Sequence, residues 1–422
     1  MLIKNISVLD VIGGKILEHQ DIYIKGQHIE KIGENLQIED DHVIDGENKL
    51  AVPGFINAHT HLGMSLFRNY ADDMELMEWL SEKIWPIEAK LNPEDVYIGS
   101  LLSMAEMIKS GATTFCDMYF PIEPVYRAMD KIGIRGAITR GMMDVEDGSI
   151  SIKEHKEGYK KYNGALDGRV TLFPGPHAIY TSSTEYLKEV IEVAKEYGGR
   201  VNIHLSETET EVRDSLEKYK MTPIEYVNSL GLLELPTVAA HCVHITDEEI
   251  EILKDKEFYP VYNPSSNLKL ASGFTPVKKL LANGIKVCLG TDGSSSNNNQ
   301  NMLEEIHIAS IVNKAVEMDP KAVKAIEVLR MATINGAEAL NINAGAIEEG
   351  RLADISIFDL NSLNFTPKNN LISALCYSAS SEDIKTVIID GKIVLDDRRF
   401  VNIDEDKLIE EVSDSMNNLI NR

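Results

Sequence analysis

The sequence predicts an α/β protein: a TIM-like (β/α)8 barrel with a small β-sandwich domain formed by both chain termini. In the middle of the chain, short apolar runs alternate with longer amphipathic segments, the pattern of parallel strands joined by helical crossovers. At both ends, strand-like runs are separated by tight-turn signals instead. A chain of 422 residues is too long for one small core and suits a large barrel with a minor domain.

Eight apolar, β-rich segments of the middle region are candidate strands, and that number favours a closed barrel over an open sheet. Amphipathic segments over 184–197 and 322–329 are predicted helices between or after them. The eight candidate strands cover residues 55–61, 113–118, 135–140, 170–174, 201–206, 238–241, 259–262 and 286–291.

Both ends of the chain are expected to join in one small β domain. Residues 2–9 and 21–29 alternate like half-buried strands, and 353–358 and 386–394 return to that style. A helical pattern follows over 404–420. We therefore expect a composite β domain from 1–52 and 347–422, and a barrel from 53–346.

Charge and composition exclude some classes of partner. Lys and Arg number 42 against 67 Asp and Glu, and the resulting net charge of −25 repels phosphate backbones and anionic lipids. No stretch approaches the roughly 18 apolar residues of a membrane span, and the N-terminus shows no signal-peptide pattern. We expect a cytoplasmic protein that acts on a small molecule, without a nucleic-acid polymer or a membrane as partner. Four cysteines without a Cys-x-x-Cys pair are expected to be buried reduced thiols.

Metal-capable side chains stand at the carboxyl ends of several candidate strands. His59 and His61 end the first strand, and residues i and i+2 of a strand point to the same side. His204 ends the fifth strand, His241 the sixth, and Asp292 the eighth. One histidine after a strand is more often structural than a ligand, and an Asp-Gly pair is usually a turn. Five such groups on the face where barrel active sites are built indicate one metal site.

Neutral imidazole and carboxylate ligands suit Zn²⁺ or another borderline divalent ion such as Fe²⁺, Ni²⁺ or Mn²⁺. An ion with an open position lowers the pKa of a water molecule toward 7, which predicts hydrolytic chemistry. Glu207, three residues after His204, is a candidate proton shuttle, although a solvated loop glutamate is the plainer reading. His241 is either a fourth histidine ligand or an acid/base group, and the sequence leaves both open.

Two motifs resemble the amidohydrolase superfamily in its single-metal branch. Residues 53–61 (PGFINAHTH) resemble the superfamily's opening motif, and 345–354 (GAIEEGRLAD) resemble its return into the β domain. Members with two metals carry a carboxylated lysine at the end of the fourth strand, whereas His177 stands near that place here. The resemblance covers essentially the whole chain and implies one metal ion.

Within this branch, six shorter stretches resemble the methylthioadenosine/S-adenosylhomocysteine deaminases. The resemblance implies that His59, His61, His204 and Asp292 bind the metal, that Glu207 holds and protonates the purine ring, and that His241 orients the water. It further implies that Glu88 binds the ribose hydroxyls and that His177 and Arg140 contact the nucleoside or its tail. The six stretches are 84–88 (IWPIE), 175–177 (GPH), 204–208 (HLSET), 241–244 (HCVH), 263–267 (NPSSN) and 290–293 (GTDG).

One departure concerns the tail of the substrate. Some members carry another arginine shortly after the position of Arg140, but residues 149–161 offer lysines and no arginine. This absence weakens the case for S-adenosylhomocysteine, whose carboxylate needs a partner, relative to methylthioadenosine or adenosine. Without the resemblance, Glu88 reads equally well as a solvated helix residue and Arg140 as a structural ion-pair partner.

The main hypothesis is hydrolytic deamination of an adenine nucleoside, with Glu207, His241 and Asp292 as catalytic residues and the inosine analogue plus ammonia as products. A guanine or other nucleobase deaminase and a triazine hydrolase are alternatives on the same site. A third hypothesis, a catalytically inactive metal-binding or interaction protein, does not explain why both Glu207 and His241 are retained. Barrels of this type often pair, which leaves a homo-oligomer open.

Overall fold

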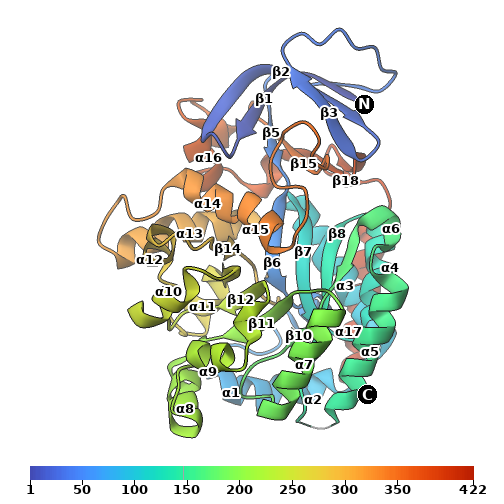
Figure 1. Cartoon of the computed structure of the whole chain (residues 1–422). Coiled ribbons are helices and arrows are strands. Elements are labelled where there is room, and N and C mark those ends of the chain that lie inside the picture. Colours follow the sequence, from blue (N-terminus) through green and yellow to red (C-terminus); the bar gives the residue numbers. More distant parts are fainter. Residues whose placement is uncertain (146) are drawn as a thin grey trace.

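The structure is a computed structural model that describes residues 1–145 and 147–422, apart from the side chain at position 77. A β-rich region built from both chain ends lies at the top of Figure 1, and a barrel of strands and helices lies below it. No helix of the described residues is long and apolar enough to cross a membrane.

The barrel consists of parallel strands in two hydrogen-bonded groups. One group has the order β10-β8-β7-β6, with β9 also beside β8, and the other has the order β11-β12-β13-β14. All eight predicted strands are present, although the eighth is reduced to two residues and the fourth is split in two. The strands are β6 (Phe55–Thr60), β7 (Ala112–Tyr119), β8 (Arg135–Met142), β9 (Val170–Leu172), β10 (Gly175–Pro176), β11 (Val201–Leu205), β12 (Thr237–His241), β13 (Phe258–Tyr262) and β14 (Cys288–Leu289).

Backbone hydrogen bonds between site residues close the two groups into a barrel. The His204 N–H donates to the His177 carbonyl (3.0 Å) on one side, and the Asp292 N–H donates to the His59 carbonyl (3.0 Å) on the other. Gly290 permits the second approach, because a Cβ there would lie 2.9 Å from the backbone nitrogen and oxygen of His59. Closure therefore fixes the spacing of the site residues through the main chain itself.

Helices cover the outside of the barrel (Figure 1). The helix predicted over 184–197 is confirmed as α7, where the Ser183 hydroxyl accepts from the Tyr186 N–H and caps the first turn. The helix predicted over 322–329 begins later, at Ala325. The helices of the barrel region are η1 (Leu62–Phe67), α1 (Leu76–Trp79), η2 (Leu80–Ile84), α2 (Trp85–Glu88), α3 (Pro93–Lys109), α4 (Ile122–Ile132), α5 (Gly148–Tyr162), α6 (Ala165–Gly168), α7 (Thr184–Glu196), α8 (Glu209–Tyr219), α9 (Pro223–Ser229), η3 (Leu232–Glu234), α10 (Asp247–Leu253), α11 (Pro264–Lys269), α12 (Val277–Ala282), α13 (Met302–Val316), α14 (Ala325–Met331) and α15 (Ile334–Ala339).

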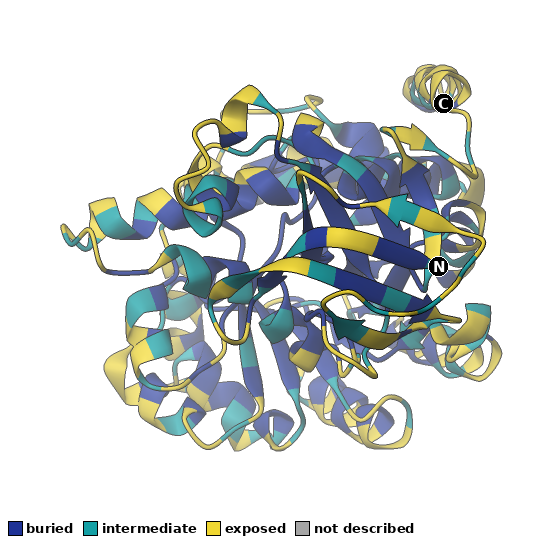
Figure 2. Cartoon of the chain, turned by 90° about the horizontal axis from the view of Figure 1, so that it is seen from above, coloured by how far each residue is buried: buried dark blue, intermediate teal, exposed yellow. Residues whose placement is uncertain are grey.

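The terminal regions share one nine-stranded sheet of order β18-β17-β16-β15-β5-β1-β2-β3, with β4 beside β1. Antiparallel pairing of β5 with β15 joins the two ends of the chain, with Ala51 opposite Ile357. Strand β1 of this sheet has both buried and exposed residues, whereas the barrel strands β6 and β11 are buried along their whole length (Figure 2). The elements are β1 (Leu2–Asp10), β2 (Lys15–Lys25), β3 (His28–Gly33), β4 (Val43–Asp45), β5 (Lys49–Pro53), β15 (Ile355–Asp359), η4 (Leu363–Phe365), α16 (Leu371–Tyr377), η5 (Ser381–Asp383), β16 (Ile384–Ile389), β17 (Lys392–Asp396), β18 (Arg399–Phe400) and α17 (Glu405–Ile420).

The sheet meets the barrel at the amino ends of the barrel strands. Arg135, the first residue of β8, is buried and donates to Asp354 (2.8 Å) and to Asp390 (2.7 Å). Burial would lower the pKa of Arg135, but these two carboxylates raise it above its usual value. The face with the carboxyl ends of the strands is therefore left free of the small sheet.

The C-terminal helix α17 packs on the barrel helix α3 rather than on the sheet. The Ser415 hydroxyl donates to Asp95 of α3 (2.8 Å), and the guanidinium of Arg422 pairs with the same carboxylate. We propose that the strands divide as predicted, with those of 1–52 and 347–422 in the small domain and those of 53–346 in the barrel. Helix α17, although it lies within 347–422, belongs with the barrel.

Candidate metal and catalytic site

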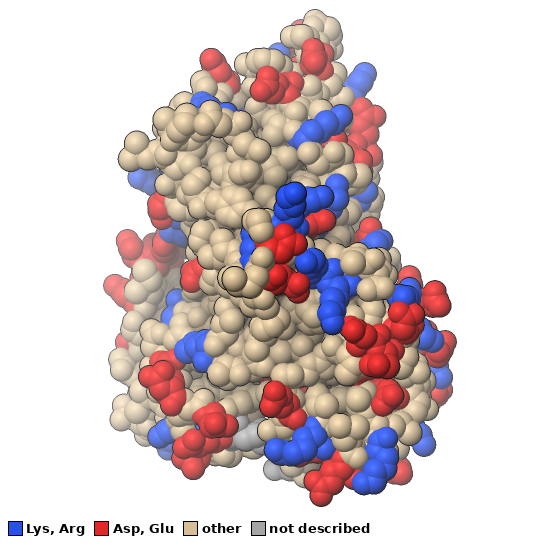
Figure 3. All heavy atoms as spheres, turned by 90° about the vertical axis from the view of Figure 1, so that its left-hand side faces the viewer, with Lys and Arg blue, Asp and Glu red and all other residues tan. Residues whose placement is uncertain are grey.

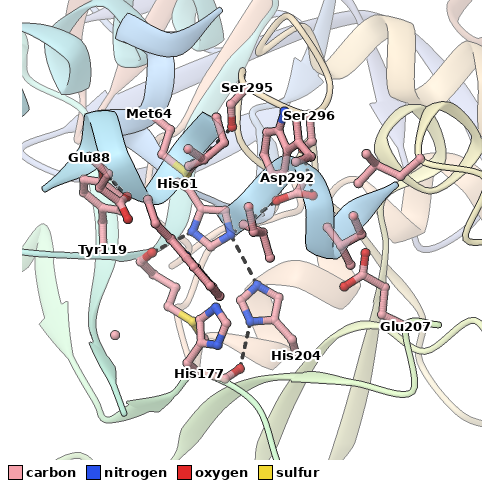
Figure 4. Close-up of a pocket in the computed structure, with 18 of the residues that line it drawn as sticks. His61, Met64, Glu88, Tyr119, His177, His204, Glu207, Asp292, Ser295 and Ser296 are labelled. Atoms are coloured by element: carbon pink, nitrogen blue, oxygen red, sulfur yellow. Dashed lines mark hydrogen bonds and ion pairs between the residues drawn. The ribbon is translucent and has the colours of Figure 1, made fainter. Parts of the chain in front are cut away.

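The predicted ligand residues meet at the carboxyl ends of the barrel strands. Nε2 of His61 lies 3.3 Å from Oδ1 of Asp292 and 3.2 Å from Nε2 of His204. Nε2 of His59 lies 3.6 Å from the same oxygen of Asp292. Side chains from three strand ends that are far apart in sequence thus surround one point (Figure 4).

Hydrogen bonds to carbonyl groups set the protonation of two imidazoles. Nδ1 of His61 lies 2.6 Å from the Met118 carbonyl, and Nδ1 of His204 lies 2.8 Å from the His177 carbonyl. A carbonyl only accepts, so each Nδ1 carries a proton and directs the opposite ring nitrogen, Nε2, toward the centre of the cluster. Nε2 is therefore the nitrogen of each ring that would bind a metal ion.

His59 provides the test of whether a metal fits this site. Its side chain is fully buried, and neither ring nitrogen has a hydrogen-bond partner among the residues that the structure describes. An unpaired polar group at that depth is costly unless something outside the protein binds it. Because Nε2 of His59 faces Oδ1 of Asp292, a divalent cation between them satisfies both, and this donor set fits one.

The charges of the cluster point the same way. Burial, together with the neighbouring imidazoles, lowers the pKa values of His59 and His204 well below their usual range, so both are neutral. Burial alone would raise the pKa of Asp292, but the hydrogen bond from His61 and the nearby imidazoles hold it well below its usual range. Burial opposes a proton on His61, yet Asp292 raises the pKa of His61 to about 9. The proton shared by this pair is the one that a metal ion would displace.

Two serines that the sequence analysis missed orient Asp292. Its Oδ2 accepts from the hydroxyls of Ser266 (2.6 Å) and Ser296 (3.1 Å), and its Oδ1 accepts from the Gly293 N–H (2.8 Å). Ser266 lies in the stretch 263–267, whose resemblance to a known motif was the one available signal. The hydroxyls hold Oδ2 so that Oδ1 faces the imidazoles.

His241 differs from the other three histidines in its hydrogen bonds. Its Nδ1 faces the amide nitrogens of Asn267 (3.0 Å) and Asn263 (3.4 Å), both of which donate. The imidazole is neutral, because burial lowers the pKa of His241 to about 4. With Nδ1 accepting, the ring proton is on Nε2, which lies 3.7 Å from Oε2 of Glu207. In that tautomer Nε2 donates a hydrogen bond. The ring also lies in one cluster with His59 and His204, whose possible ligand atoms are within 4.8 Å of one another.

Glu207 is a buried group and not a solvated loop glutamate. Its side chain is 7% exposed, and burial together with Asp292 raises the pKa of Glu207 to about 8. Its loop is fixed by Glu211, whose carboxylate accepts from the N–H groups of Ser206 (3.1 Å) and Glu207 (2.7 Å). Sequence reasoning misses this role of Glu211, because nothing in the local pattern separates it from the neighbouring glutamates.

The site opens into a cavity that connects with solvent. Glu88 and Glu207 stand on opposite sides of the imidazole pair of His61 and His204, and the ring of His177 lies beside that of His204, 4.7 Å between centroids (Figure 4). The Tyr119 hydroxyl donates to Glu88 (2.7 Å), while burial raises the pKa of Glu88. Apolar side chains supply much of the remaining wall: Met64, Leu76, Trp79, Leu80, Ile84, Trp85, Met118, Phe120, Met143 and Leu270.

Arg140 is the predicted substrate-binding residue that does not reach the cavity wall. Its Nε donates to Oε2 of Glu154 (2.7 Å), and its guanidinium lies 4.9 Å from the centre of the Phe120 ring. Phe120 lines the cavity, so Arg140 stands one layer behind the wall.

The remaining predictions concern the surface and the cysteines. On the face drawn in Figure 3, acidic and basic side chains are interspersed among the described residues, and no continuous basic surface is present. All four cysteines are buried and free. Cys242, between His241 and His244, donates toward the Ala239 carbonyl and takes no part in the site.

Comparisons with known proteins agree with this geometry. A profile of the amidohydrolase family matches residues 50–394. The 5-methylthioadenosine/S-adenosylhomocysteine deaminase of Caldanaerobacter subterraneus subsp. tengcongensis is 52% identical over 100% of this chain and 98% of its own length. The 5′-deoxyadenosine deaminase of Methanocaldococcus jannaschii is 49% identical over 98% of each chain.

Among solved structures, a zinc-bound adenosine deaminase from Xanthomonas campestris superposes with a TM-score of 0.96 at 30% identity, covering 100% of this chain and 98% of the other. The family profile covers most of the chain, and the relatives extend over nearly all of it. The chain belongs to the amidohydrolase family.

Proposed function

We propose that this protein is a hydrolytic deaminase of adenine nucleosides, acting on 5′-methylthioadenosine, S-adenosylhomocysteine or adenosine. The observation that carries the proposal is the buried Glu207, which keeps a proton near neutral pH beside Asp292 and His241. A carboxyl group in that state can give a proton to a ring nitrogen. Relatives named for deamination of such nucleosides support the choice of substrate class.

One divalent ion is proposed to be held by His59, His61, His204 and Asp292. The unpaired nitrogens of His59 support this set, as do the carbonyl groups that bind Nδ1 of His61 and His204 and leave Nε2 of each ring facing the cluster. Zn²⁺ is the proposed ion, and Fe²⁺, Ni²⁺ or Mn²⁺ would suit the same donors. When bound, such an ion polarises water and lowers its pKa toward 7.

The catalytic residues then have separate tasks. Glu207 protonates the ring nitrogen next to the amino-bearing carbon as water adds to that carbon. Asp292 takes the proton from the attacking water and passes it to the departing ammonia. His241 donates its Nε2 proton in a hydrogen bond that orients the water. One C–O bond forms and one C–N bond breaks, and the second proton of the water leaves the new C–OH group and restores the Glu207 carboxyl as the carbonyl forms. The products are the inosine analogue and ammonia.

The substrate is oriented by residues on the other side of the imidazoles. Glu88 is proposed to accept hydrogen bonds from the ribose hydroxyls, and His177 to contact the nucleoside. The position of Glu88 opposite Glu207 supports this orientation, because a nucleoside has its base at one end and its sugar at the other (Figure 4).

The test measures ammonia release by zinc-loaded protein from the three nucleosides, in the wild type and in Glu207→Gln. We expect turnover of at least one nucleoside, and a loss of about 10²-fold or more in kcat for the variant, because an amide has no proton to transfer in this way. Glu209→Gln, an exposed glutamate two residues away, is the matched control. No turnover of any of the three, or full activity of Glu207→Gln, contradicts the proposal.

A further inference from the structure

The cavity wall offers no positive charge to a substrate. Among the described residues that line the cavity, none is a lysine or an arginine. An anionic group at the end of a substrate would therefore enter without a cation to pair with, and an unpaired carboxylate is costly to take out of water. Arg140 is the cation that the sequence suggested for the tail of the substrate, and its guanidinium stands behind Phe120.

Arg140 is already neutralised by a residue of the same protein. Besides the ion pair with Glu154 of α5, it donates from Nη1 to the Gly141 carbonyl, and its flat face lies over Phe120. Phe120 and Gly141 both line the cavity. The Arg140 side chain is only 12% exposed, so these contacts hold it at the back of the wall with its charge compensated.

The wall in front of Arg140 suits a neutral tail. Phe120, Met118 and Met143 present aromatic and thioether surface there, and methionine adapts its shape to small apolar groups. The relatives are named for nucleosides that differ in their 5′ group. This group is apolar in 5′-deoxyadenosine and 5′-methylthioadenosine and zwitterionic in S-adenosylhomocysteine.

We propose that Glu154 determines the substrate specificity of this site: it holds Arg140 in an ion pair, so that the pocket favours adenine nucleosides with neutral, apolar 5′ substituents over those with a charged tail. This inference rests on the proposed deaminase function. In this proposal Glu154 acts through Arg140, and the role requires no contact of Glu154 with the substrate or with the metal ligands.

The experiment compares kcat/KM for 5′-methylthioadenosine, 5′-deoxyadenosine and S-adenosylhomocysteine in the wild type and in Glu154→Gln. The wild type is expected to prefer both apolar nucleosides over S-adenosylhomocysteine by about tenfold or more. Glu154→Gln keeps the shape of the side chain and removes its charge. We expect it to raise the ratio of S-adenosylhomocysteine to methylthioadenosine activity about fivefold, a modest gain because Glu154 is 44% exposed and water screens it.

Two controls separate this effect from general changes of charge or fold. Glu157→Gln makes the same change on the same helix, at a side chain that is 68% exposed and faces Lys153 instead, and the activity ratio should stay unchanged. The double variant Glu154→Gln/Arg140→Met should lose the gain, since the effect acts through the guanidinium. An adenosine with a neutral alkylthio tail as long as homocysteine should be accepted by the wild type, which separates charge from length.

The outcomes distinguish the two proposals. If zinc-loaded wild type deaminates none of the nucleosides, the proposed function fails. If it deaminates methylthioadenosine but prefers S-adenosylhomocysteine, or if Glu154→Gln leaves the ratio within twofold of the wild type, the role of Glu154 is refuted and the deaminase function stands.

Discussion

The two hydroxyl groups on Asp292 allow a quantitative test of how the site is held. Ser266 donates to Oδ2 at 2.6 Å and Ser296 to the same oxygen at 3.1 Å, while Oδ1 faces His59 and His61. Replacing Ser266 by Ala removes the shorter of the two bonds and leaves the proposed metal ligands in place. The carboxylate then has one hydroxyl fewer to fix its rotation.

The size of the effect follows from the charge on the acceptor. A hydrogen bond to an ionised group contributes about 1.5–3 kcal/mol, and a loss of about 1.4 kcal/mol is tenfold in an equilibrium constant. Because Ser296 still binds Oδ2, we expect Ser266→Ala to weaken zinc binding about tenfold and Ser296→Ala to weaken it less. The double variant should lose about 100-fold, at the upper end for groups that orient metal ligands.

Zinc affinity is measured by competition with a chromophoric chelator, and turnover is measured on the same samples at saturating zinc. Ser295→Ala is the matched control, because the Ser295 hydroxyl points to the sulfur of Met64 and not to Asp292. The reasoning is refuted if the double variant binds zinc within twofold of the wild type.

Three further predictions address the metal, the ribose and the pH. Removal of metal by a strong chelator should abolish turnover, and added Zn²⁺ should restore it. Zinc at 100 times its Kd should raise the free energy of unfolding by about 2.7 kcal/mol, which is measured as a higher Tm. Turnover that persists in the presence of the chelator contradicts the metal site. Glu88→Gln should raise KM for a nucleoside about tenfold but leave a free base such as adenine nearly unaffected, and an equal effect on both would favour a nucleobase substrate. Burial lowers the pKa of His155 to about 4, so protonation favours the unfolded chain, and stability is complete above pH 6.5 and falls as the pH drops toward 4. Urea unfolding at pH 6.5 and 5 should show His155→Gln losing about 2 kcal/mol less than the wild type over that interval, and equal losses would show that His155 is not held neutral.

The sequence predicted the positions of the ligand residues because each is a local signal. A histidine or aspartate directly after an apolar run marks the end of a buried strand, and in a barrel all such ends share one face. The same logic located the eight strands. The predicted eighth strand, 286–291, is longer than the observed strand β14, which pairs with β13 only at Cys288–Leu289. Beyond β14, the chain joins β6 by hydrogen bonds from single residues.

The interactions that tune the site could not be predicted in this way. Ser266 and Asn267 act through hydrogen bonds to residues that other strands place beside them, and Glu211 accepts from N–H groups of its own loop. The ion pair of Arg140 is a further example, because its partner Glu154 lies on the following helix. Pairings of this kind depend on the packing of whole elements, which periodicity does not encode.

The attachment of the small sheet has a consequence for how this protein can change over time. The buried contact of Arg135 with Asp354 and Asp390 secures the amino ends of the strands, at the opposite end of the barrel from the imidazoles. Mutations in the loops around the cavity therefore spare the joint between the two regions. New substrate preferences can be tried at one end of the barrel while the anchoring at the other end stays intact.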